Sequence, residues 1–170
     1  MLDDSDQIAP SDQASDLKAK PFGREEFLTS VAPLILRWAL AVTILSAVAD
    51  RFGIWGPAGA TNVAWGDWPH FVAYTVKVNR FLPGVFAPAL AVAATGAEGL
   101  LGLALILGVF PRSVAWASAA LLGLFAVAMT WSFGIKAPLN YSVFADAAAA
   151  FVLGAWPAAA RSKSAPARRR

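Results

Sequence analysis

Residues 85–110, with the sequence VFAPALAVAATGAEGLLGLALILGVF, decide the fold class of this chain. They are apolar or small throughout, with one ionisable residue, Glu98. A membrane-spanning helix needs about 20 predominantly apolar residues, because each residue advances about 1.5 Å through a hydrocarbon core of about 30 Å. The stretch is long enough to span, and it places Glu98 near its middle. We therefore predict a transmembrane helix that carries a single acid.

The composition indicates the same class of protein. Of the 170 residues, 58% are hydrophobic and 15% are charged, whereas about 25% are charged in typical soluble domains. The mean hydropathy is +0.56, a value typical of integral membrane proteins. The chain contains no cysteine, which excludes disulfides, thiolate nucleophiles and an iron–sulfur cluster held by this chain. The single histidine, His70, offers no second metal ligand, so no metal site is predicted.

Apolar stretches elsewhere in the chain predict three further spans. The fold class we expect is all-α, an integral membrane four-helix bundle formed by residues 27–157. Its predicted spans are residues 31–49, 85–110, 113–133 and 141–156. The flanking segments are predicted to be cytoplasmic tails, the first disordered and the second basic, at residues 1–26 and 158–170.

The connection between the first two spans, residues 50–84, is too long for a bare loop. Its first half is rich in Gly, Pro and Trp. Its second half has helical periodicity, with one apolar face formed by Trp68, Phe71, Val72, Thr75, Val78 and Leu82. This pattern predicts an amphipathic helix over residues 68–82 that lies on the membrane surface across the outer end of the bundle. Before it, Asp50 and Arg51 are expected to form a salt bridge at the end of the first span.

Three ionisable residues lie inside the predicted spans, namely Arg37, Glu98 and Asp146. Helical rise puts Arg37 about 9 Å and Glu98 about 18 Å from the inner edge, and Asp146 about 8 Å from the outer edge. We expect Arg37 to reach toward Glu98, and Arg51 and Lys136 to be the partners of Asp146. Two interpretations remain open: ion pairs that fix helix register, or a ligand or proton site. The candidate catalytic residues are Glu98 and Arg37, and the candidate cofactor-binding residues are these two with Asp146 and Lys136.

Small residues recur at intervals of four in the second and fourth spans. Such residues let helix backbones approach closely in lipid, so these rows predict the packing faces. The rows are Ala91, Thr95 and Gly99; Ala94, Glu98 and Gly102; and Asp146, Ala150 and Gly154. Glu98 is therefore expected to face the interior of the bundle.

Several short motifs carry a family resemblance. They are ADRFGIWG at residues 49–56, FLP at 81–83, ATGAEGLLGL at 94–103, Gly108, Arg112, and KAPLNYSVF at 136–144. In this order they resemble the DoxX family of small four-helix bacterial membrane proteins, over roughly residues 30–157. The resemblance implies a multi-pass protein of the bacterial inner (plasma) membrane. The resemblance also implies a function linked to redox reactions, because relatives include the membrane subunit of a thiosulfate:quinone oxidoreductase and partners of redox-stress complexes.

Three functions follow as alternatives. The first is a redox-linked subunit of a quinone-linked oxidoreductase, in which Glu98 and Arg37 lie near the quinone head group. The second is a non-enzymatic membrane anchor or assembly partner that presents the Trp-rich outer segment to a redox protein. The third is a small transporter with Glu98 as its coupling carboxylate.

The expected partners follow from the same features. They are the lipid bilayer and a redox protein, with a homo-oligomer left open. The basic tail is expected to bind anionic lipid headgroups, and nucleic acid is not an expected partner.

The distribution of positive charge predicts the topology. Four spans place both termini on one side, and positively charged loops favour the cytoplasm. Most of the basic residues outside the spans lie on the side of the termini, including Lys18, Lys20, Arg24, Arg112, Arg161, Lys163 and residues 168–170. A reporter active only in the periplasm should therefore be silent when fused at Arg170 and active when inserted within residues 56–66. Activity at Arg170 would contradict the topology.

Overall fold

The computed structural model describes residues 24–156, and within this range the chain forms helices and loops without any strand. Its elements are α1 (Arg24–Asp50), α2 (Trp68–Val78), the 3-10 helix η1 (Gly84–Phe86), α3 (Ala87–Leu107), α4 (Pro111–Phe133), α5 (Lys136–Asn140) and α6 (Val143–Ala155). The predicted all-α class is therefore confirmed for the described part of the chain.

Three of these helices are long and apolar enough to cross a membrane. The candidate spans are Thr29–Asp50, Gly84–Leu107 and Pro111–Phe133. Large apolar side chains cover their outer faces, and Leu100 and Leu124 are 72% and 63% exposed. Exposure of this extent suits contact with lipid, so the chain is a membrane protein. α6 is apolar but has only 13 residues, about 20 Å of helix, so the fourth span stays a prediction.

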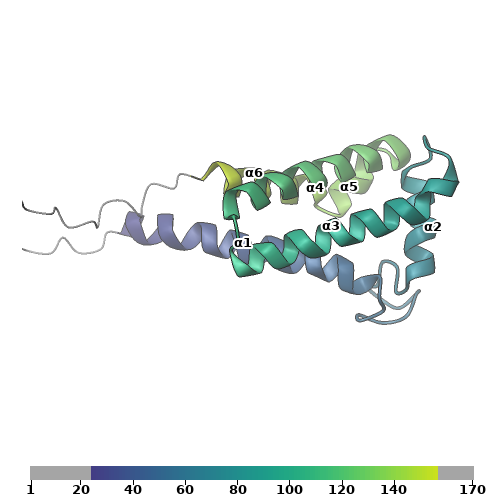
Figure 1. Cartoon of the computed structure of the whole chain (residues 1–170), viewed down its shortest axis with the longest axis horizontal. Helices are drawn as coiled ribbons and strands as arrows, with labels where there is room; N and C mark the ends of the chain where they lie inside the picture. The colour runs from purple at the N-terminus through teal and green to yellow at the C-terminus, as the bar shows by residue number, and fades with distance from the viewer. Residues whose placement is uncertain (1–23, 157–170) are drawn as a thin grey trace, which may run out of the picture.

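The long helices lie side by side along the long axis of the molecule (Figure 1). α1 packs against α3 and α4 packs against α6. α2 lies across the end of the bundle where α1 ends and α3 begins, and the start of α1 and the end of α6 lie at the opposite end (Figure 1). The core is formed by buried apolar residues of these four helices: Leu40, Ala41, Ile44, Leu105, Ala115, Leu122, Ala150 and Leu153.

The helix boundaries differ from the predicted ones at several ends. α1 begins at Arg24, inside the segment predicted as a tail, whereas residues 1–23 and the predicted basic tail at 158–170 lie outside the described residues. α2 ends at Val78 and not at Leu82. The reason is a C-terminal cap, because Asn79 donates both its backbone N–H and its side-chain amide to the Thr75 carbonyl.

Two glycines confirm the predicted close packing between helices. A Cβ on Gly102 would lie 2.7 Å from Cγ of Leu45, so α3 touches α1 directly at this level. A Cβ on Gly154 would lie 3.1 Å from the Trp116 indole, so α6 and α4 meet there in the same way. Gly99, by contrast, has no neighbouring atom within 4 Å of a Cβ position. The tight face of α3 therefore contains Gly102 and not Gly99.

The connection between α1 and α2 is a compact loop that depends on glycine. Gly66 has φ +73°, and a Cβ on it would lie 2.2 Å from the backbone nitrogen of Ala58. Gly53 has φ +72°, and a Cβ there would lie 2.8 Å from the Gly66 carbonyl oxygen. Only glycine combines left-handed backbone geometry with contacts this close.

The substitution Gly66→Ala should unfold this loop. The added methyl group would meet backbone atoms that cannot move independently, in addition to a left-handed strain of about 1–2 kcal/mol. Gly59→Ala is the matched control, because Gly59 has φ +86° but no atom within 4 Å of its Cβ position. Amide hydrogen exchange in detergent should accelerate through residues 53–67 in the first variant only. Equal protection in both variants would contradict this account of the loop.

Candidate functional site

A buried ion pair joins the end of α1 to the middle of α3. Arg51, the first residue after α1, forms an ion pair through Nη2 with Oε2 of Glu98. Its Nη1 donates a hydrogen bond of 2.6 Å to Oγ1 of Thr95, one helical turn before Glu98. The side chains of Arg51 and Glu98 are only 3% and 6% exposed. The prediction that Glu98 faces the interior of the bundle is thus confirmed.

The register between α1 and α3 explains why Arg51 reaches this acid. The two helices run antiparallel (Figure 1), and Leu45 lies against Gly102. Six residues farther along α1 is Arg51, and six residues back along α3 is Gly96. The guanidinium therefore arrives at the level of Thr95 and Glu98.

Aromatic rings cover the guanidinium. The Cζ atom of Arg51 lies 3.9 Å from the ring centroid of Phe71 and 5.3 Å from that of Trp65. These two rings pack edge to face at 5.1 Å, and Trp65 also contacts Tyr74. A guanidinium over aromatic faces is attracted by their quadrupoles, most strongly where water is excluded. Burial raises the pKa of Tyr74 to about 12, so its phenol group stays neutral beside Trp65.

The carboxylate of Asp50 holds the loop that carries Trp65. Its Oδ2 accepts a 2.8 Å hydrogen bond from the backbone N–H of Ala64. Its Oδ1 accepts hydrogen bonds from the backbone N–H groups of Trp65 and Gly66, at 3.3 and 2.9 Å. The expected salt bridge between Asp50 and Arg51 is therefore wrong: Asp50 binds backbone amides of the loop between α1 and α2, and Arg51 binds Glu98.

The electrostatics of the site follow from this burial. Burial lowers the pKa of Arg51, and the neighbouring charges of Glu98 and Asp50 oppose that shift. A guanidinium stays protonated in proteins even so, and the pair therefore brings a fixed positive charge to Glu98. The Nε atom of Arg51 is buried and has no hydrogen-bond partner among the described residues. The site thus holds an unused donor next to a carboxylate.

The expected pairing of Arg37 with Glu98 is wrong. Arg37 lies against the C-terminal end of α3, where a Cβ on Gly108 would be 2.6 Å from its Nη1. That point is ten residues, about 15 Å, along α3 from Glu98. Arg37 forms no ion pair within residues 24–156, and its positive charge lies where the dipole of α3 favours it.

The expected partners of Asp146 are also wrong. Arg51 is bound to Glu98, and neither Asp146 nor Lys136 forms an ion pair in the part of the chain that the structure describes. Asp146 is half-buried in the first turn of α6, where the helix dipole favours a carboxylate. Of the four candidate residues, only Glu98 belongs to the buried site.

Sequence reasoning missed most of the residues around Glu98. Thr95 was identified only as a small packing residue, and Phe71 only as part of an apolar helix face. The available signals were the adjacent opposite charges of Asp50 and Arg51 and the three-residue spacing of Thr95 and Glu98, which puts both on one face of a helix.

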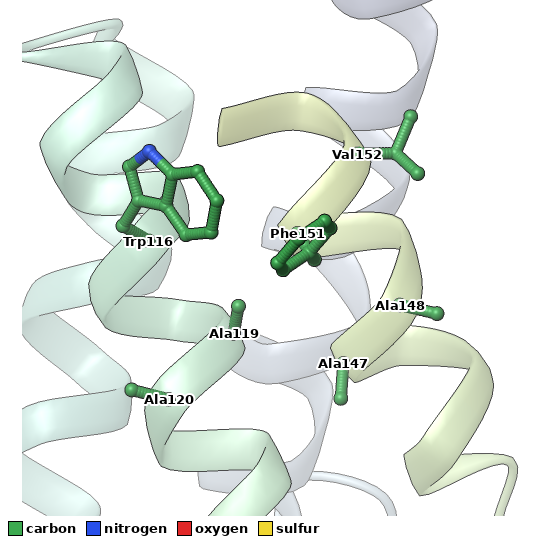
Figure 2. Close-up of a pocket in the computed structure, with 7 residues that line it drawn as sticks. All are labelled: Trp116, Ala119, Ala120, Ala147, Ala148, Phe151 and Val152. Carbon is green, nitrogen blue, oxygen red and sulfur yellow. The ribbon is translucent and has the colours of Figure 1, made fainter. Parts of the chain in front are cut away.

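A separate apolar groove lies between α4 and α6. It has a volume of about 520 Å³ and is lined by Trp116, Ala119, Ala120, Ala147, Ala148, Phe151 and Val152. The rings of Trp116 and Phe151 lie at one end and alanine methyl groups at the other (Figure 2). None of the candidate residues lines it. Within residues 24–156, no group of three or more His, Asp or Glu residues could hold a metal ion.

Comparisons with models of protein families, with curated proteins and with solved structures find no match for this chain.

A double-mutant cycle should measure the ion pair. Glu98→Gln leaves Arg51 buried without its counter-charge and should destabilise the protein by about 3–5 kcal/mol. Arg51→Met should cost a similar amount, whereas the double variant should be much less unstable than the sum of the two. Unfolding in detergent, followed by tryptophan fluorescence, measures all three.

Arg37→Met is the control for this cycle. Because Arg37 lies about 15 Å from Glu98 along α3, its effect should add to that of Glu98→Gln. Strong coupling between residues 37 and 98, with none between 51 and 98, would contradict the observed pairing.

Proposed function

We propose that this chain is a redox-linked subunit of the bacterial plasma membrane that binds a quinone beside Arg51 and Glu98. The observation that carries the proposal is the buried carboxylate–guanidinium pair under two aromatic rings. Intramembrane acids commonly mark ligand sites or proton paths. The resemblance to the DoxX family, whose members include a quinone-linked oxidoreductase subunit, points in the same direction.

The residues of the site fit the head group of a quinone. Its carbonyl oxygens are hydrogen-bond acceptors, and the buried Nε of Arg51 is a donor without a partner among the described residues. The rings of Phe71 and Trp65 lie over the guanidinium, and Phe71 is only 5% exposed, so a planar quinone ring would stack here in place of one of these rings once the cover moves aside. Reduction of a quinone takes up protons, and the carboxyl group of Glu98 can hold and release one. The electrons would come from a partner redox protein.

The proposal includes four spans, with α6 as the last. α6 packs along α4 and carries one acid, Asp146, in its first turn. α2 would be the amphipathic helix at the outer membrane surface, since its inner side buries Phe71 and Thr75 whereas Val76 and Lys77 are exposed. Both termini would then be cytoplasmic, and the quinone would enter from the outer half of the bilayer.

A second function has its own support. The folded outer loop exposes large apolar side chains, with Phe52, Ile54 and Trp55 at 61%, 69% and 58% exposure. A surface of this kind suits contact with another membrane or redox protein. The chain would then act as a non-enzymatic anchor or assembly partner, and the buried pair would serve only to hold the loop in place.

Titration of purified protein with a short-chain quinone separates the two functions. Binding should be lost in Phe71→Leu, which keeps apolar volume but removes the ring over Arg51, and in Glu98→Gln where that variant remains folded. Arg37→Met should bind as the unmodified protein does, because Arg37 lies at the other end of α3. Fluorescence quenching and equilibrium dialysis give the affinities. Equal binding by folded Phe71→Leu and Glu98→Gln, or none by the unmodified protein, would reject the quinone site and favour the anchor.

A further inference from the structure

A second groove opens at the outer end of the bundle, on the other pair of helices from the Arg51 site. It has a volume of about 610 Å³ and is lined by Arg80, Val127, Thr130, Trp131 and Phe144. Arg80 follows α2, Phe144 lies in the first turn of α6, and the other three residues belong to the last turns of α4. The groove therefore lies where the segment after α2 reaches the end of α4, beside the start of α6.

Arg80 is fixed at the mouth of this groove. Its Nη2 donates a 3.2 Å hydrogen bond to the backbone carbonyl of Trp131, in the last turn of α4. The negative end of the α4 dipole favours a cation at this position. Arg80 is exposed and forms no ion pair within the described part of the chain. Its remaining N–H groups are therefore held in place and available to an anion.

The floor of the groove is apolar and open. Val127 and Trp131 are 63% and 70% exposed, and Phe144 is 38% exposed. The hydroxyl group of Thr130 is already bound to the Ala126 carbonyl at 2.7 Å. A positive charge at one end and an uncharged apolar floor at the other fit an amphiphile with an anionic head. The groove between Trp116 and Phe151 (Figure 2) lacks such a charge.

We propose that this groove binds an anionic phospholipid. The phosphate lies against the guanidinium of Arg80, and one acyl chain lies along Val127 and Phe144. Trp131, at the same end of the bundle, matches the preference of tryptophan for the membrane–water interface. The site does not depend on the quinone proposal, since none of its residues belongs to the Arg51–Glu98 cluster.

Lipid titration of the full chain in detergent, followed by native mass spectrometry, tests the head group. The unmodified protein should retain phosphatidylglycerol more strongly than phosphatidylcholine. Arg80→Gln should weaken phosphatidylglycerol binding about fivefold, the effect expected for one basic residue near an anionic headgroup. It should weaken phosphatidylcholine binding less, because the choline cation of that lipid already offsets the charge of its phosphate. Arg80→Lys, which keeps the charge, should retain most of the preference.

Lys77→Gln is the matched control, because Lys77 is an exposed cation on α2 that does not line the groove. It removes the same charge and should leave phosphatidylglycerol binding within about twofold of the unmodified protein. Equal losses of phosphatidylglycerol binding in Lys77→Gln and Arg80→Gln would show that the lipid is held by general charge attraction, and would overturn the proposed site. Unchanged binding in Arg80→Gln would overturn it as well.

Val127→Trp tests the apolar floor, because the larger side chain fills the path of the acyl chain. It should weaken retention of both lipids, with the unfolding temperature unchanged. Normal lipid retention in this variant would overturn the proposal. A shift in oligomeric state in place of lipid loss would do the same, because it would assign the groove to a second copy of the chain.

Discussion

The ion pair between Arg51 and Glu98 is the constraint on which the half of the molecule that contains α2 depends. It joins the end of α1 to the middle of α3, and its aromatic cover brings in α2. Buried ion pairs add little net stability, because desolvation of both charges offsets much of their attraction. Loss of one partner is costly, however, because it leaves a buried charge. The pair therefore acts mainly by selecting one register of α1 against α3.

Asp50, the residue before Arg51, makes a second set of contacts at the end of α1. Arg51 points into the bundle, whereas Asp50 binds the backbone of the loop between α1 and α2. α1 thus ends opposite the middle of α3, and α3 continues about nine residues, about 14 Å, beyond it. α2 and the loop before it lie at the end of α1, where a longer α1 would continue (Figure 1). Two adjacent residues thereby attach both α3 and the covering loop to the end of α1.

Hydrophobic length and periodicity predicted the helices because they are local properties of the chain. Residues 85–110 predicted α3, and the apolar face that includes Phe71 predicted α2. The partner of Glu98 could not be predicted in the same way, because it depends on how far α1 is shifted along α3. We assumed that both spans end at the same level, which put Arg37 near Glu98. The contact of Leu45 with Gly102 shifts α1 along α3 toward the C-terminal end of α3 and places Arg51 next to Glu98 instead.

The shift of α1 along α3 also determines from which end of the bundle a ligand would reach Glu98. Toward the start of α1, the core residues Leu40, Ile44 and Leu105 lie between Glu98 and the end of the bundle. Toward α2, the rings of Trp65 and Phe71 cover the guanidinium. Those rings sit on a loop and a short helix, elements that open more readily than long packed helices. The quinone proposed above would therefore have to displace this aromatic cover, while the hydrogen bonds from the N–H groups of Ala64 and Gly66 to Asp50 kept the loop attached.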